Sequence, residues 1–455
     1  MDKKLWQIIE KEIKRQEETL DLIPSENFVD LETLFIVGSP LMNKYAEGYP
    51  GKRYYPGNKF IDEIENLAKE RALKVFKLNP NEWAVNVQPY SGSPANLAVY
   101  LALAEPGETI MGLNLFHGGH LTHGHKVSYT GKLFKSVQYG VNPQTETIDY
   151  EELEKLVLEY KPKIIISGTT AYPRTIDFKR IGEIAKKVGA YHVADTSHIA
   201  GLVIANLHPS PFSFADIVTM TTHKTLRGPR GAVIFMRKEL EEKINKSVFP
   251  GLQGGPHMQT IAGIAYAFGR ALKKDFFNYQ KQIVKNAKFL AEELKKRGFK
   301  LYTDGTDNHL MIVDLKPLTQ TSLGCMQTKA YSKQNYNKLT QKLDKNSNST
   351  QSIGKIAETL LERANIIANR NSLPSDTSPF NPTGIRLGTP AVTSRGMKEK
   401  EMKLIAEFFE RILIKKEKPE RIKKEVIKLV KNFPLPYRKW LIRLHLLPSS
   451  RFFYH

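Results

Sequence analysis

Residues 189–225 read GAYHVADTSHIAGLVIANLHPSPFSFADIVTMTTHKT, and this stretch decides the fold. Two short apolar runs, YHVAD at 191–195 and DIVTM at 216–220, are separated by a longer segment. Apolar runs of this length are typical of strands that are buried on both faces of a sheet. Asp195 closes the first run and Lys224 soon follows the second. We therefore expect an acid and an amine at the ends of two successive strands.

The alternation of strand and helix patterns extends over about residues 84–237. Further strand-like runs occupy residues 84–88, 109–113, 163–167 and 232–236, and apolar residues have helical spacing at 94–104, 150–160 and 178–188. Such alternation predicts an α/β fold with a mostly parallel central sheet and helices on both faces. Ligands of such sheets bind at the carboxyl ends of the strands, so site residues are expected in the loops that follow them.

The sequence predicts an arm and two domains. An amphipathic helix marked by Leu5, Ile9 and Ile13 begins the N-terminal arm, which we place at residues 1–40. A large domain is expected at 41–268 and a smaller α+β domain at 269–455. The smaller domain includes a polar insertion at 317–351, rich in Thr, Gln, Asn, Ser and Lys, and a tail at 438–455.

Composition excludes several classes of protein. Of 455 residues, 41% are hydrophobic and 25% are charged, a mixture typical of folded globular chains and not of disordered ones. The longest apolar run, about eight residues, is far shorter than the ~20 that span a bilayer. Charges interrupt every apolar cluster near the N-terminus, so we expect no secretory signal. A single cysteine, Cys325, cannot form an intramolecular disulfide, which favours a cytoplasmic location.

The net charge raises the question of an anionic partner. The chain has 68 Lys and Arg against 47 Asp and Glu, a formal charge of +21. Nucleic acid, an anionic surface, anionic small ligands or a lysine-rich composition would each account for the excess. No recognised nucleic-acid-binding motif occurs, so specific nucleic-acid binding is not expected.

Three features together suggest a pyridoxal-phosphate site. Residues 91–94, Ser-Gly-Ser-Pro, follow a predicted strand and open an apolar helix, whose free N–H groups favour a phosphate. Asp195 could keep a pyridine nitrogen protonated, and Lys224 could form a Schiff base with an aldehyde. A capped helix and solvated surface charges are the ordinary alternatives. The combination of a helix start, an acid and an amine at strand ends supports the cofactor interpretation, and spacing alone leaves both interpretations open.

Other polar residues leave alternatives open. A glycine-rich loop carries four imidazoles, at His117, His120, His123 and His125, which could bind a metal or stack on a flat cofactor. No cysteine lies nearby and no helical i, i+4 pair is present, so no metal is expected. Arg386 lies in an apolar segment, where either a ligand carboxylate or an internal acid would satisfy its guanidinium.

Seven motifs occur in order along the chain. They are LIPSEN at 22–27, NKYAEGYPGKRYY at 43–55, HGGHLTHG at 117–124, TTHKTLRGPRG at 221–231, FPGLQGGP at 249–256, NRNS at 369–372 and GIRLGTP at 384–390. With them the chain resembles the serine hydroxymethyltransferase family of fold-type I pyridoxal-phosphate enzymes. The resemblance runs from about residue 3 to about residue 437, apart from the insertion.

The resemblance implies a reaction and a cofactor. L-serine and tetrahydrofolate, or a related pterin, would be converted reversibly to glycine and 5,10-methylenetetrahydrofolate by aldimine chemistry on pyridoxal 5'-phosphate. Lys224 would form the aldimine, Asp195 would pair with the ring nitrogen, and His120 would stack on the ring. The other implied cofactor contacts are Tyr45, Ser91, Gly92, Ser93, Thr170, His198, His223, Gly254 and Gly255.

The resemblance also implies substrate contacts and a homodimer with shared active sites. Arg386 and Ser25 would bind the amino-acid carboxylate, and Glu47 would move protons at the serine hydroxyl or folate. Tyr55 would lie near the substrate, and Arg230 would tune the site electrostatically. The positions that match pterin contacts are Leu115, Gly119, Leu121 and Asn371. The residues expected from the partner chain are Tyr45, Glu47, Tyr55, Gly254 and Gly255.

The nearest rival function is another fold-type I activity, an aldolase that cleaves β-hydroxy amino acids without folate. The tyrosine-rich segment at 43–55 and Asn371 favour the folate-dependent reaction, because both match the resembled family at positions near folate.

Overall fold

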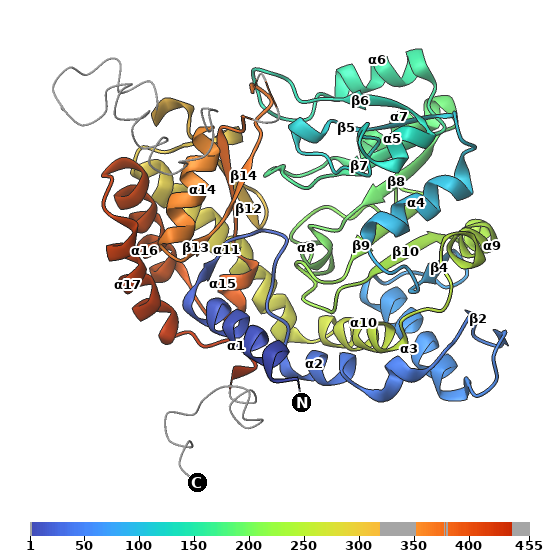
Figure 1. The fold of residues 1–455 in the computed structure, drawn as a ribbon. Coiled ribbons are helices and arrows are strands. Elements are labelled where there is room, and N and C mark those ends of the chain that lie inside the picture. The colour runs from blue at the N-terminus through green and yellow to red at the C-terminus, as the bar shows by residue number, and fades with distance from the viewer. Residues whose placement is uncertain (1, 319–351, 377, 379–380, 439–455) are drawn as a thin grey trace, which may run out of the picture. The chain divides into compact units, whose positions relative to one another are not determined.

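The computed structural model describes residues 2–318, 352–376, 378 and 381–438 (Figure 1). Most of the expected insertion at 317–351, and the expected tail beyond residue 438, lie outside these residues. The chain forms two compact units, one of residues 27–282 and one of residues 1–26 with 283–455. The sequence favours boundaries near 40 and 268 instead, because no change of composition marks the first residues as part of the C-terminal unit.

The unit of residues 27–282 is built on a seven-stranded sheet, whose strands are drawn in blue (β4) to cyan and green in Figure 1. The strands in spatial order are β4 (Trp83–Asn86), β10 (Ala232–Arg237), β9 (Ile217–Thr221), β8 (Tyr191–Asp195), β7 (Ile164–Gly168), β5 (Thr109–Leu113) and β6 (Lys135–Tyr139). Strand β10 is antiparallel to both of its neighbours, and the other neighbouring pairs are parallel. The predicted mostly parallel sheet is confirmed.

Helices cover both faces of this sheet, as predicted. Ile234 packs in the apolar cluster that includes α4 (Gly92–Leu103). The ring of the next residue, Phe235, lies 6.5 Å from that of Phe268 on α10 (Met258–Ala271). Successive side chains of a strand point to opposite faces, so α4 and α10 lie on opposite sides.

The predicted crossover helices are present and have ordinary caps. Helices α6 (Tyr150–Tyr160) and α7 (Phe178–Val188) each begin after an aspartate whose carboxylate accepts a backbone N–H of the first turn. Gly189 ends α7 with φ +68, a left-handed conformation that glycine adopts without strain. The remaining elements of this unit are α2 (Leu31–Val37), η1 (Pro40–Asn43), β2 (Gly48–Tyr49), β3 (Lys52–Arg53), α3 (Lys59–Val75), η2 (Leu115–His117), α5 (Tyr129–Leu133), α8 (Ala200–Ile204), η3 (Lys238–Leu240), α9 (Glu241–Lys246) and η4 (Ser247–Leu252).

The other unit has a four-stranded antiparallel sheet, in the order β11 (Lys300–Leu301), β12 (Leu310–Asp314), β15 (Gly384–Gly388), β14 (Asn369–Asn371). Strand β1 (Leu20–Asp21) pairs in parallel with β13 (Ile366–Ile367), which joins the N-terminal residues to this unit. The remaining elements are α1 (Lys3–Glu18), η5 (Tyr302–Asp304), α14 (Ile353–Arg363), α15 (Pro390–Ser394), α16 (Glu399–Phe409), η6 (Glu410–Ile414) and α17 (Pro419–Lys431). Helix α11 (Lys274–Lys296) begins in one unit and ends in the other.

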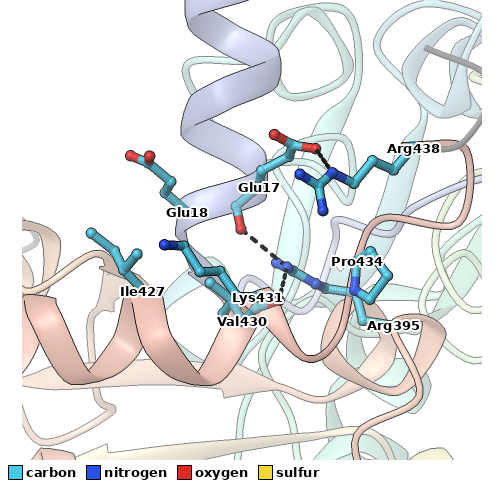
Figure 2. Close-up of a pocket in the computed structure, with 8 residues that line it drawn as sticks. All are labelled: Glu17, Glu18, Arg395, Ile427, Val430, Lys431, Pro434 and Arg438. Carbon is cyan, nitrogen blue, oxygen red and sulfur yellow. Dashed lines mark hydrogen bonds and ion pairs between the residues drawn. The ribbon is translucent and has the colours of Figure 1, made fainter. Parts of the chain in front are cut away.

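One buried guanidinium fastens α1 to α17 (Figure 2). Arg395 donates to the carbonyl oxygens of Gln16, Glu17 and Thr19 at the end of α1, at 2.9 to 3.3 Å. It also donates to those of Val430 and Phe433 at the end of α17, at 3.1 and 2.6 Å. The last carbonyls of a helix carry partial negative charge, so one cation stabilises both ends. The small pocket beside it, about 120 Å³, is also lined by Glu18, Ile427, Lys431, Pro434 and Arg438.

Within the ranges described above, no helix is long and apolar enough to cross a membrane.

Candidate active site

The loops that leave one edge of the seven-stranded sheet carry most of the predicted site residues. Asp195 ends β8 and Lys224 follows β9, the adjacent parallel strand. Both side chains are buried, with 8% and 9% of their surface exposed. Strand β4 is antiparallel to β10, which is antiparallel to β9, so β4 and its following loop point the same way. That loop contains Ser91 and starts α4.

Asp195 is held as a buried carboxylate by three donors. Its Oδ1 accepts the backbone N–H of Ser197 at 3.0 Å. Its Oδ2 accepts from Nδ2 of Asn96 at 2.9 Å and lies 3.2 Å from Nε2 of His123. Burial alone would raise the pKa of Asp195, but the bonds from His123 and Ser197 and the imidazoles of His123 and His120 hold that pKa well below its usual range. The carboxylate therefore stays ionised, as a partner for a protonated ring nitrogen must.

The start of α4 fits a phosphate group. Ser91 precedes the helix and makes no side-chain capping bond, so the N–H groups of the first turn have no hydroxyl acceptor from that residue. A Cβ on Gly92 would lie 2.8 Å from Cγ2 of Thr221, so only glycine fits there without a shift. Helix α4 begins at Gly92, and Ser93 and Pro94 are its second and third residues.

His223 adds an orphaned polar atom to this group. Its Nδ1 is buried and has no hydrogen-bond partner among the described residues. Burial, with the positive charges of Lys224 and Arg230, lowers the pKa of His223 to about 3. A neutral imidazole with an unused nitrogen can donate to an anion such as a phosphate. The residues present thus fit pyridoxal phosphate, with an amine, an ionised carboxylate and a phosphate cradle.

The histidines of the loop at 117–125 have different hydrogen-bond partners. Nδ1 of His120 accepts the backbone N–H of Thr122 at 3.2 Å and lies 2.7 Å from its hydroxyl. Nδ1 of His117 accepts the backbone N–H of Val141 at 2.9 Å. His123 turns to Asp195, as described above. Among the residues that the structure describes, no three His, Cys, Asp or Glu side chains are grouped to hold a metal ion.

The loops after β5 and β7 are joined to each other. The backbone N–H of Thr170 donates to the carbonyl oxygen of Gly118 at 2.7 Å, beside His120 and Gly119. A Cβ on Gly119 would lie 2.0 Å from the carbonyl oxygen of Leu113, so the turn requires glycine. Leu115 is half-buried and Leu121 is exposed. His198 is buried in the loop after β8.

A second cluster in the same unit contains the residues expected from a partner chain. The hydroxyl of Tyr45 donates to Glu47 Oε1 at 3.2 Å, and the rings of Tyr45 and Tyr55 meet edge to face at 5.0 Å. A Cβ on Gly254 would lie 3.2 Å from Glu47, and one on Gly255 would lie 3.2 Å from Tyr45. These five residues are therefore one cluster within a single chain.

A buried arginine fixes the backbone on both sides of Glu47. Nη1 of Arg53 donates to the carbonyl oxygens of Ala46 and Gly48, at 2.9 and 2.8 Å. Arg53 in turn pairs with Glu65, which is fully buried, at 2.7 Å and with Asp62 at 2.9 Å. This ion-pair network holds Glu47 in place.

The other unit contains the remaining predicted residues, Ser25, Asn371 and Arg386. Arg386 is buried on β15, where its Nε donates to Oδ1 of Asn369 at 3.2 Å. Burial lowers the pKa of Arg386 to about 10, so its side chain remains a cation at neutral pH. The backbone N–H of Gly388, two residues further along β15, donates to the carbonyl oxygen of Leu22, which brings the segment of Ser25 to this strand.

Sequence reasoning missed Asn96, His123 and Arg53. The signal for Asn96 was a polar residue inside the apolar pattern of 94–104, because a buried amide needs partners. His123 was visible as one of four imidazoles, without a means of choosing among them. Nothing in the sequence separated Arg53 from other basic residues. Arg230, expected to tune the site, is exposed.

A mostly parallel sheet with a lysine, an ionised aspartate and a phosphate cradle at its carboxyl edge defines the class of fold-type I pyridoxal-phosphate enzymes. A family model described as serine hydroxymethyltransferase matches residues 1–352 and 343–409. The chain belongs to the serine hydroxymethyltransferase family, and the resemblance in its motifs is confirmed. It is therefore a pyridoxal-phosphate-dependent transferase of one-carbon metabolism, which converts L-serine and tetrahydrofolate to glycine and 5,10-methylenetetrahydrofolate.

Proposed function

We propose that this chain performs the family's reaction with Lys224 as the amine that holds the cofactor and Asp195 as the carboxylate that faces its ring nitrogen. The observation that carries the proposal is a buried amine and a buried, ionised carboxylate that follow or end adjacent parallel strands at the same edge of the sheet. Pyridoxal phosphate, when bound, supplies an electron sink for a bond broken at the amino-acid α-carbon. Asp195 supports this because a negative charge keeps the ring nitrogen protonated.

The other cofactor contacts follow from the same edge of the sheet. Ser91, Gly92 and Ser93 would bind the phosphate with the N–H groups of α4, and His223 would donate from Nδ1. His120 would stack on the ring and exclude water from one face. His198 and Thr170 would bind the phenolic oxygen and its surroundings. Each assignment is supported by the position of the residue just after the carboxyl end of β4, β5, β7, β8 or β9, all of which point to the same edge of the sheet.

For the substrates, we propose that Arg386 and Ser25 bind the amino-acid carboxylate. The planar fork of a buried guanidinium suits a carboxylate with two parallel hydrogen bonds. Glu47 would move the proton at the serine hydroxyl, with Tyr55 beside the substrate and Arg230 contributing positive charge. The proposed pterin contacts are Leu115, Gly119, Leu121 and Asn371, and a related pterin remains an alternative carrier.

We also propose a homodimer in which the cluster of Tyr45, Glu47, Tyr55, Gly254 and Gly255 completes the site of the other copy. The rings of Tyr45 and Tyr55 are 53% and 43% exposed. Large exposed aromatic side chains are enriched at protein interfaces, so a partner surface would cover them. Because the five residues contact one another, one interface could carry them all.

A cytoplasmic location is proposed from the single cysteine, since chains of oxidising compartments more often contain disulfides. Fractionation of cells that express the chain at native level would test it, and recovery in a secreted or membrane fraction would contradict it.

Serine cleavage with and without tetrahydrofolate tests the reaction. We expect glycine to form at least about tenfold faster with tetrahydrofolate, because a bound acceptor replaces a slow loss of the carbon to water. A folate already methylated at N5 is the matched control, since it cannot accept the carbon there. Equal rates with and without tetrahydrofolate would instead favour a folate-independent aldolase.

A further inference from the structure

Asn96 is an amide buried in an apolar helix. It is 1% exposed on α4, where the other buried residues are alanine, valine, leucine and tyrosine. A buried amide without partners destabilises a fold, so its bonds show what it is for. Nδ2 donates to Oδ2 of Asp195 and to Oγ1 of Thr122, each at 2.9 Å. Oδ1 accepts the hydroxyl of Thr219 at 2.8 Å.

The direction of these bonds is set by chemistry. An ionised carboxylate only accepts, so the NH₂ group of Asn96 must face Asp195. The hydroxyl of Thr219 then donates to the amide oxygen and fixes the plane of the amide. Thr219 lies on β9 as the register partner of Asp195 on β8, so its position is set by the sheet itself.

The network continues to the imidazole that is expected to stack on the cofactor. The hydroxyl of Thr122 accepts from Asn96 and lies 2.7 Å from Nδ1 of His120, to which it can give its own proton. The backbone N–H of Thr122 donates to the same nitrogen at 3.2 Å. A backbone N–H can only donate, so Nδ1 accepts, and the neutral ring has its proton on Nε2.

We propose that Asn96, oriented by Thr219, is a positioning residue that aims Asp195 at the cofactor's ring nitrogen and, through the hydroxyl of Thr122, holds the ring of His120 in place. The inference rests on the proposed roles of Asp195 and His120. The Asn96 amide thus links Asp195, which would bind the ring nitrogen of the cofactor, to His120, which would stack on the face of that ring. Hydrogen bonds to charged groups are the stronger ones, so the branch to Asp195 dominates.

The test compares Thr219→Val with Thr219→Ser. Valine has the shape of threonine without the hydroxyl, while serine keeps the hydroxyl that orients Asn96. We expect Thr219→Val and Asn96→Ala to bind pyridoxal phosphate roughly tenfold more weakly than the wild-type chain, and Thr219→Ser to stay within about threefold. The affinity is measured by titrating the cofactor-free chain, and circular dichroism establishes that each variant is folded.

A second readout separates positioning from packing. The visible absorbance of the bound cofactor is followed against pH in both Thr219 variants. We expect the Thr219→Val curve to shift towards alkaline pH. When Asp195 is held less firmly, the ring nitrogen keeps less of its positive charge, and that charge then lowers the basicity of the Lys224 nitrogen less. The Thr219→Ser curve should follow the wild-type curve.

The inference is wrong if Thr219→Val binds as tightly as Thr219→Ser with an unchanged curve, or if Thr219→Ser is weakened as much as Thr219→Val. Either result leaves the proposed function standing. A wild-type chain that fails to bind pyridoxal phosphate would overturn the proposed function, and this inference with it.

Discussion

Burial decides the charge of the groups in the seven-stranded unit, and the outcome depends on their partners. Asp195 remains ionised in the interior because three donors face it. His192 lies on the same strand and is also buried, but burial outweighs the carbonyl oxygen of Phe214 that faces it, which lowers the pKa of His192 to about 4. Donors around an acid keep it charged, whereas desolvation keeps this imidazole neutral.

His192 should make the fold sensitive to acid. Its pKa is about 4 in the folded chain and about 6.5 when unfolded, so the unfolded chain binds the proton more readily. The stability that the fold gains from burying a neutral His192 is therefore fully present above pH 6.5 and is lost as the pH falls towards 4. Between pH 7.5 and 5 the loss is about 2 kcal/mol of unfolding free energy. The free energy of unfolding, measured with urea for wild type and His192→Gln at both pH values, should fall less from pH 7.5 to 5 in the variant. An equal fall in both chains would contradict this.

Sequence reasoning identified residues by their position along the chain and missed residues that only the folded structure brings together. Lys224 and Asp195 follow apolar runs, so strand order alone indicated them. Asn96 and His123 act on Asp195 from 99 and 72 residues away in the chain. No spacing rule joins such positions, because the sheet register brings them together.

At the scale of elements, long and strongly apolar segments were predictable and edge elements were not. Six strands of the central sheet match apolar runs to within one or two residues. The seventh, β6, is a half-exposed edge strand with the sequence KSVQY, which lacks a buried run. Strands of two or three residues, such as β1 and β13, depend on pairing with distant partners and have no pattern of their own.

The junction of α1 and α17 depends on Arg395, whose removal should be costly. In Arg395→Leu the five carbonyl oxygens that it binds lose their donor, and we expect a loss of about 3 kcal/mol or more. Arg438→Ala is the matched control in the same pocket, because Arg438 forms a 2.8 Å ion pair with Glu17 from a half-exposed position. That pair should contribute less than about 1 kcal/mol. A smaller loss in Arg395→Leu than in Arg438→Ala, measured by urea unfolding, would contradict this account.

At the scale of the whole molecule, our proposal divides the site residues between two units and between two chains. Cofactor residues lie in residues 27–282, while Ser25, Asn371 and Arg386 belong to the other unit. Part of the +21 charge serves this site, since Lys224 is assigned to the cofactor and Arg386 to the substrate carboxylate. Most of the remaining basic residues are scattered, so the charge indicates composition more than a partner.

The most direct test of the account is complementation between two inactive variants, Lys224→Ala and Glu47→Gln. Each alone should lack serine hydroxymethyl transfer, because every site lacks one of the two groups. After equal mixing and subunit exchange, half of the dimers are mixed, and each has one site with both defects and one with neither. We predict about a quarter of wild-type activity, with mixed dimers verified by a tag on one variant. Activity in either variant alone, or none in verified mixed dimers, would contradict the account.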